Sequence, residues 1–148
     1  MADAELTMFD SHEDQGDTAS AAQALDIALR RAVDAEKLAR TGPDQANAER
    51  TLARVLDRYG NTEGARRATT RAYAASRNDI HQMTATVLDA ARRALTRGDL
   101  RASRNAVRHA IDANVAPEDL VYPALWLHLL ERRLGTPSDG TVEEAFAK

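Results

Sequence analysis

Apolar residues recur at helical spacing in successive segments of this chain, and the segments end at breaks that contain Gly or Pro. The clearest breaks are Thr41-Gly42-Pro43, Gly60-Asn61 and Gly98-Asp99. Alanine, the best helix former, is the commonest residue, whereas the aromatic residues that favour strands make up only 4% of the chain. The sequence therefore predicts an all-α fold with six to seven helices. They are expected to pack as antiparallel hairpins in a short right-handed solenoid or bundle.

Capping residues and breaks give approximate bounds for these helices. Helices are expected from Ser20 to the break at 41–43, from Asp44 to Tyr59, from Asn61 or Thr62 to Asn78, from Asp79 to Gly98, from Asp99 towards Pro117, and over 117–134, with a short last helix capped by Thr141 and Glu144. The same periodicity assigns Ala22, Tyr59 and Ile80 to buried faces.

The first 17 residues differ from the rest of the chain. They carry six acids and no Lys or Arg, with one short apolar run that contains Leu6, Met8 and Phe9. Residues 1–17 are therefore predicted to be a disordered acidic tail, and residues 18–148 a single helical domain. Leu6, Met8 and Phe9 would make the tail a docking motif for another protein or a latch on the chain's own basic region, and the alternative is an inert terminus.

The chain contains no cysteine, which excludes disulfides, thiolate zinc sites and cysteine nucleophiles. It also has no apolar run of about 18 residues and no secretory signal pattern. A cytoplasmic protein that does not enter the membrane is therefore expected.

Two helical hairpins in the middle of the chain resemble tetratricopeptide repeats. The second hairpin offers Ala91, Gly98, Asp99, Val107 and Ala110 at matching places, and the first offers Leu52, Ala53, Leu56, Ala65 and Ala72. The resemblance covers residues 44–117 only, with a spacing of 38 between the breaks, and it departs from the pattern at Glu49, Thr69 and Ala94. Alanine-rich antiparallel hairpins of other families offer similar matches.

The resemblance implies a concave ligand surface formed by the first helix of each pair. In this chain it selects Asn47, Arg50, Arg54, Leu88, Arg92 and Leu95. Such a basic groove with apolar positions suits an acidic peptide with one or two hydrophobic anchors. A protein-binding adaptor or assembly subunit, whose partner is another protein, is the function expected from it.

A second hypothesis follows from charge. Between Arg50 and Arg108 there are 13 arginines and five acids. Within this segment, Arg97, Arg101, Arg104 and Arg108 are predicted to line one edge of two neighbouring helices, where guanidinium groups could hold the phosphates of a nucleic acid. A solvated arginine face with no partner is the simpler alternative.

No catalytic, metal or cofactor motif is found, so an enzyme is not expected. The four histidines, His12, His81, His109 and His128, are scattered singly, and none pairs with another at the spacing of helical metal ligands. The helix expected over 117–134 is apolar around most of its circumference. It must be covered within the chain or form a homodimer surface.

Overall fold

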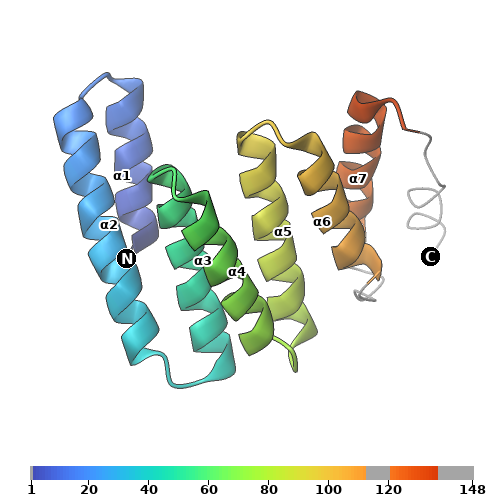
Figure 1. Ribbon diagram of the computed structural model, residues 1–148, viewed down its shortest axis with the longest axis horizontal. Helices are drawn as coiled ribbons and strands as arrows, with labels where there is room; N and C mark the ends of the chain where they lie inside the picture. Colours follow the sequence, from blue (N-terminus) through green and yellow to red (C-terminus); the bar gives the residue numbers. More distant parts are fainter. Residues whose placement is uncertain (1, 113–120, 137–148) are drawn as a thin grey trace. The chain divides into compact units, whose positions relative to one another are not determined.

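The computed structural model describes residues 2–112 and 121–136, which form seven α-helices and no strand (Figure 1). The helices are α1 (Ala2–Asp14), α2 (Thr18–Leu38), α3 (Gly42–Arg58), α4 (Thr62–Ala75), α5 (Ile80–Thr96), α6 (Leu100–Asp112) and α7 (Val121–Leu134). Within residues 2–78, and again among the described residues from 79 onward, each helix packs against the next in antiparallel hairpins, which confirms the predicted all-α class. Pro117 and the predicted last helix from Thr141 lie outside the described residues.

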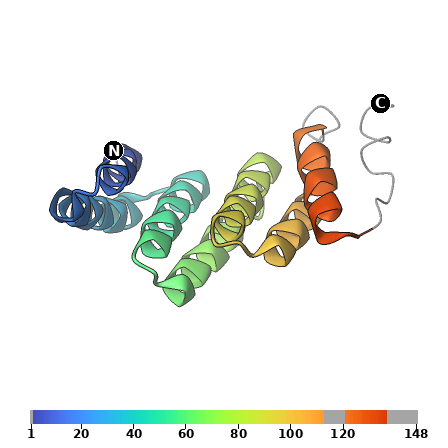
Figure 2. The same ribbon diagram turned by 90° about the horizontal axis from the view of Figure 1, so that it is seen from above.

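The chain divides into two compact units between Asn78 and Asp79. In the first unit, α2 packs against both α1 and α3, and α3 packs against α4. In the second unit, α6 packs against both α5 and α7, and Figure 2 shows the three helices side by side. The expectation of a single domain over residues 18–148 stays a prediction.

Buried alanines hold the helices together. Most of the buried hydrophobic residues are alanines, and in the first unit they form one cluster with a few larger side chains such as Leu25, Leu52 and Val55. In the second unit Ala91, Val107, Leu127 and Leu130 form the core. Small side chains let helix backbones approach closely, so the buried alanines allow the helices to pack at short distances.

The same turn joins the two helices of the α1–α2, α3–α4 and α5–α6 hairpins. A glycine at positive φ is followed by an Asp or Asn whose side chain accepts a hydrogen bond from a backbone N–H of the next helix. The three pairs are Gly16-Asp17, Gly60-Asn61 and Gly98-Asp99. In each, the N–H of the Asp or Asn donates to the carbonyl oxygen five residues earlier, at 2.9 Å. This ending closes the first helix while the cap opens the second, so the chain reverses within a few residues.

Gly98→Val is expected to lower the free energy of unfolding by about 1 kcal/mol or more, because a branched L residue is strained at positive φ. The φ angle of Gly98 is 77°, and no atom lies within 4 Å of a Cβ added there, so the loss would report backbone strain and not crowding. Urea denaturation followed by circular dichroism measures it. Gly98→Asn is the matched control and should lose less, because Asn tolerates this conformation. Equal stability of Gly98→Val and the parent chain would contradict the prediction.

Residues 1–17 were predicted to be a disordered tail, but Ala2–Asp14 form helix α1. Ala2, Leu6 and Phe9 share one face of this helix and are buried in the core cluster with residues of α2 and α3. The acidic composition of the segment indicated disorder only because its apolar run is too short to bury itself. The surface of α2 and α3 supplies the missing burial, and α1 is ordered by these contacts.

Three residues assigned to buried faces are instead exposed, namely Ala22, Tyr59 and Ile80. Tyr59 is the C-terminal cap of α3, and its hydroxyl donates a hydrogen bond to the carboxylate of Asp26 on α2. Partial burial of the phenol, together with this hydrogen bond, raises the pKa of Tyr59 to about 12. The aromatic ring therefore spans the edge of the α2–α3 interface and does not enter the core.

None of the helices described here is both long and apolar enough to cross a membrane.

Candidate functional site

The acids of α1 engage the arginines of the first unit. Asp3 Oδ1 lies 2.7 Å from Nη1 of Arg54, and Asp10 Oδ2 lies 3.0 Å from Nη2 of Arg58. A third ion pair joins Glu5 of α1 to an arginine of α2, Arg31. The N-terminal acids thus contact the basic region, as the latch hypothesis requires, but they do so from a packed helix.

The predicted partner-binding residues lie on two helices in different units. Asn47, Arg50 and Arg54 lie on α3, where Arg50 donates a hydrogen bond to Asn47 and Arg54 pairs with Asp3. Leu88, Arg92 and Leu95 lie on α5, which belongs to the second unit.

A groove of about 550 Å³ lies between α1, α2 and α3 in the first unit, and Asn47 is part of its lining. Its charged lining residues are Arg31 and the three acids Asp3, Asp34 and Asp44. An excess of carboxylates does not suit an acidic ligand, because like charges repel. This groove therefore does not fit the predicted chemistry.

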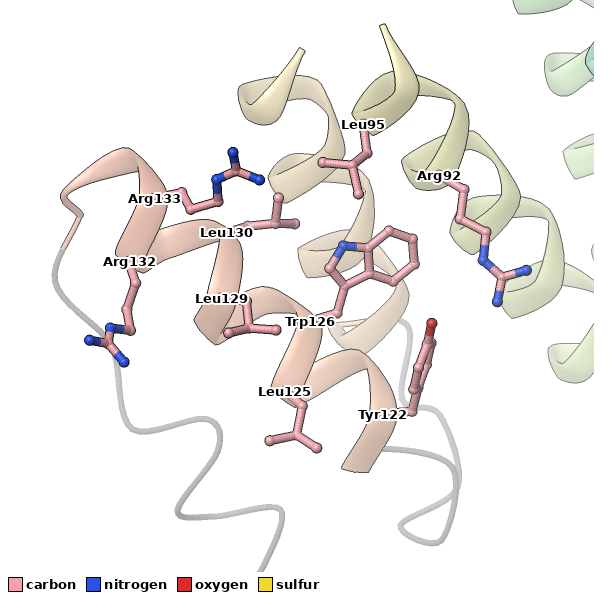
Figure 3. Close-up of a pocket in the computed structure, with 9 residues that line it drawn as sticks. All are labelled: Arg92, Leu95, Tyr122, Leu125, Trp126, Leu129, Leu130, Arg132 and Arg133. Carbon is pink, nitrogen blue, oxygen red and sulfur yellow. The ribbon is translucent and has the colours of Figure 1, made fainter. Parts of the chain in front are cut away.

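The second unit contains a larger and more apolar groove, of about 840 Å³, between α5 and α7 (Figure 3). Its lining consists of four leucines, two aromatic residues and three arginines, which are Leu95, Leu125, Leu129, Leu130, Tyr122, Trp126, Arg92, Arg132 and Arg133. Two of the predicted partner-binding residues, Arg92 and Leu95, are among them. Leu88 is partly buried against the core cluster of this unit.

The aromatic pair of α7 shapes this groove. Trp126 points from α7 towards Leu95 and Arg92 of α5, as Figure 3 shows. Its ring centroid lies 6.0 Å from that of Tyr122, with an interplanar angle of 61°, which is an edge-to-face arrangement. Tyr122 is 57% exposed and Leu129 60% exposed, whereas Leu130 is buried. The groove thus combines a packed floor with large apolar groups that contact solvent.

The three arginines of the groove form no ion pair with another described residue. This distinguishes Arg92, Arg132 and Arg133 from the arginines of α3, two of which pair with α1. Their guanidinium groups can accept a carboxylate in bidentate geometry. The described lining includes no acid, histidine or hydroxyl residue apart from the Tyr122 phenol.

Two of the four predicted phosphate-binding arginines are turned towards a buried carboxylate. Arg104 and Arg108 of α6 donate hydrogen bonds to Oε1 of Glu131 on α7, at 3.1 and 3.0 Å. Glu131 is only 2% exposed. Arg97 and Arg101 are exposed at the end of α5 and the start of α6. Of the four arginines predicted to bind phosphates, two therefore pair with a buried carboxylate of the same unit and two lie on the surface.

Sequence reasoning missed most of the groove residues, which are Tyr122, Leu125, Trp126, Leu129, Leu130, Arg132 and Arg133. The available signal was the apolar character of the whole 117–134 segment followed by two arginines. That signal indicates a surface in need of a partner, but it does not say which side of the helix faces outward. Packing on α6 decides this, because it buries Ala124, Leu127 and Glu131.

No protein-family model matches this sequence, and a search of curated proteins finds no match to it either.

Proposed function

We propose that this protein is a non-enzymatic interaction adaptor or assembly subunit that binds an acidic, partly apolar segment of another protein in the α5–α7 groove. The observation that carries the proposal is the groove itself, in which arginines without an ion-pair partner among the described residues surround exposed leucine and aromatic side chains. The apolar anchors of the ligand would pack on Trp126 and Leu129, and its carboxylates would pair with Arg92 and Arg133.

Charge supports an acidic ligand over a second copy of this face. A homodimer that joined two α5–α7 grooves would bring three arginines of each copy together, and like charges at an interface are unfavourable. An acidic segment gains from the same charges. The apolar lining of the groove also favours a peptide, since hydrophobic anchors in apolar pockets contribute most of the binding energy at interfaces.

Nucleic acid is the second candidate, since Tyr122 and Trp126 could stack on bases beside the arginines. The four leucines of the lining argue for apolar side chains of a protein instead, because they offer neither stacking nor hydrogen bonds to bases. We keep nucleic acid as an outcome of the test below.

The arrangement of the groove also supports tetratricopeptide-like hairpins as the finer description of the fold. In that family the first helix of each pair lines the ligand surface. Helix α5, the first helix of its hairpin, contributes Arg92 and Leu95 to the groove. The proposed class of ligand is therefore an extended or helical peptide segment lying in the groove along α5.

A short synthetic peptide with Leu and Phe one helical turn apart, flanked by glutamates, is expected to bind the full chain and change its fluorescence. Trp126 is the only tryptophan, so the signal comes from the groove. Arg92→Gln/Arg133→Gln should weaken binding about tenfold, since two exposed charge pairs contribute about 1.4 kcal/mol together. Added salt should weaken binding to the parent chain in the same direction.

Arg40→Gln/Arg101→Gln is the matched control, because it removes the same charge from exposed positions outside the groove and should leave the affinity unchanged. A peptide with lysines in place of the glutamates should not bind. Equal affinity of the two double variants would contradict the proposal. Tighter binding of a single-stranded oligonucleotide with quenching of Trp126 would favour the nucleic-acid function instead.

A further inference from the structure

Helix α1 packs on α2 and α3 of the first unit and lies alongside α2 (Figure 1). Its buried side chains are Ala2, Leu6 and Phe9, which join the core cluster of this unit. Isolated helices of 13 residues are only marginally stable in water, so α1 is helical because it is docked. Undocking of α1 therefore releases a short segment and uncovers an apolar surface on α2 and α3.

Exposed ion pairs lie on both sides of this apolar contact, towards α3 on one side and towards α2 on the other. The pairs are Asp3–Arg54, Asp10–Arg58 and Glu5–Arg31. The three arginine side chains are between 37% and 42% exposed. Ion pairs of this kind contribute little to stability and are screened by salt. They favour an acidic helix on the α2–α3 face without holding it tightly.

The α2–α3 face continues beyond the N-terminal end of α1. Helix α1 has 13 residues, whereas α2 has 21 and α3 has 17. The groove of about 550 Å³ lies at this end, where Ala2 and Asp3 line it together with Ala35 and Leu38 of α2 and Ala48 of α3. Leu38 is 69% exposed. A helix one turn longer than α1 would therefore contact surface that α1 does not cover.

Charge indicates what the added turn should carry. On α2 and α3 the charged lining residues of the groove are Arg31, Asp34 and Asp44. Arg31 pairs with Glu5 of α1, and Asp34 forms an exposed pair with Lys37 at 3.5 Å. Because carboxylates outnumber the arginine here, a cationic side chain suits this end of the face. A leucine in the same turn would pack on the exposed apolar surface of α2.

We propose that the α2–α3 face under α1 is a second ligand site, which takes an amphipathic helix of a partner protein in exchange for α1. The partner helix has the pattern of α1, an apolar stripe between acids that pair with Arg31, Arg54 and Arg58. It adds an N-terminal turn with a leucine and a lysine for the groove. Helix α1 covers the site when the partner is absent. The site lies within the first unit and does not depend on the function proposed for the α5–α7 groove.

The probe is a fluorescein-labelled peptide with the sequence of Ala2–Asp14 behind the added turn Leu-Lys-Ala-Ala. Its binding to the full chain is measured by fluorescence anisotropy. It should bind about tenfold more tightly than the same peptide without the added turn, because burial of one leucine side chain contributes at least this factor. An extended peptide with serines in place of the leucine and phenylalanine of the α1 sequence should not bind.

Hydrogen exchange of the unmodified chain tests the opening of α1 without any substitution. Amides in the middle of α1 should exchange about ten times faster, or more, than amides in the middle of α3, because α1 opens while the rest of the unit stays folded. Matching rates would overturn the proposal, since α1 would then leave only when the whole unit unfolds.

Glu5→Cys/Arg31→Cys allows α1 to be locked in place, because the natural chain has no cysteine and these two side chains contact each other. A short bismaleimide joins α1 to α2, whereas a monofunctional maleimide only caps the thiols and gives the matched control. The capped form should bind the extended peptide, and the locked form should bind it about tenfold more weakly or worse, because the site stays covered.

Equal affinity of the locked and capped forms would overturn the proposal. If the unlabelled peptide in addition changes the fluorescence of Trp126 equally in both forms, it occupies the α5–α7 groove. That result overturns the second site and leaves the function proposed for the groove standing.

Discussion

Arg71→Met is expected to lower the free energy of unfolding by about 3 kcal/mol or more, because it leaves the carboxylate of Glu49 buried without a partner. Glu49 lies on α3 and is 0% exposed, and Arg71 of α4 donates to both of its oxygens, at 2.5 and 2.8 Å. The guanidinium of Arg71 is itself partly exposed, and the ion pair raises the pKa of Arg71. The cost of the substitution therefore arises mainly at the carboxylate.

Urea denaturation followed by circular dichroism measures this loss. Glu49→Met/Arg71→Met is the control that separates a stranded charge from lost packing, because it removes both charges and keeps the side-chain volume similar. It should be substantially more stable than Arg71→Met, since replacement of a buried ion pair by apolar residues is often neutral. If the double variant is less stable than the single one, the buried carboxylate is not the cause.

Arg104→Met/Arg108→Met is expected to destabilise the second unit by about 3–5 kcal/mol, because it strands Glu131 in the α6–α7 interface. Both arginines donate to the same oxygen of Glu131, so either one alone can still neutralise the carboxylate. Each single variant should therefore lose less than half as much as the double variant. This non-additivity is expected when two residues share one partner.

Trp126 lies on the same helix as Glu131, so its fluorescence in urea reports the unfolding of this region. Arg101→Met on α6 is the matched control and should change stability little, because Arg101 is exposed. Additive losses in the two single variants would contradict a shared role for Arg104 and Arg108. They would indicate that the two arginines act through separate contacts.

Helix bounds and turns could be predicted from sequence because their chemistry is local. Gly98 and Asp99 were expected to end one helix and cap the next, and the structure confirms both, with Gly98 at positive φ and Asp99 accepting from the N–H of Ala102. Such capping depends only on residues within one turn of the chain. The bounds of α3, predicted from Asp44 to Tyr59, differ from the structure by a few residues only.

The candidate site was only partly predictable. Arg92 and Leu95 were selected as ligand contacts and do line the groove, whereas Asn47, Arg50 and Arg54 form contacts within the first unit. Nothing near Arg54 in the sequence indicates that Asp3 would reach it. The pairing depends on α1 packing across α2 and α3, which joins residues far apart in the chain.

Local chemistry by itself thus determined that this chain is helical, where most of its helices begin and end, and that glycine turns fold them into hairpins. Tertiary contacts alone decided that the acidic N-terminus is an ordered helix, that Glu49 and Glu131 are buried, and that Arg92, Arg132 and Arg133 remain unpaired with other described residues. The physical reason is that propensity and capping act between neighbours in sequence. Burial and ion pairing depend on surfaces that exist only after distant helices have packed.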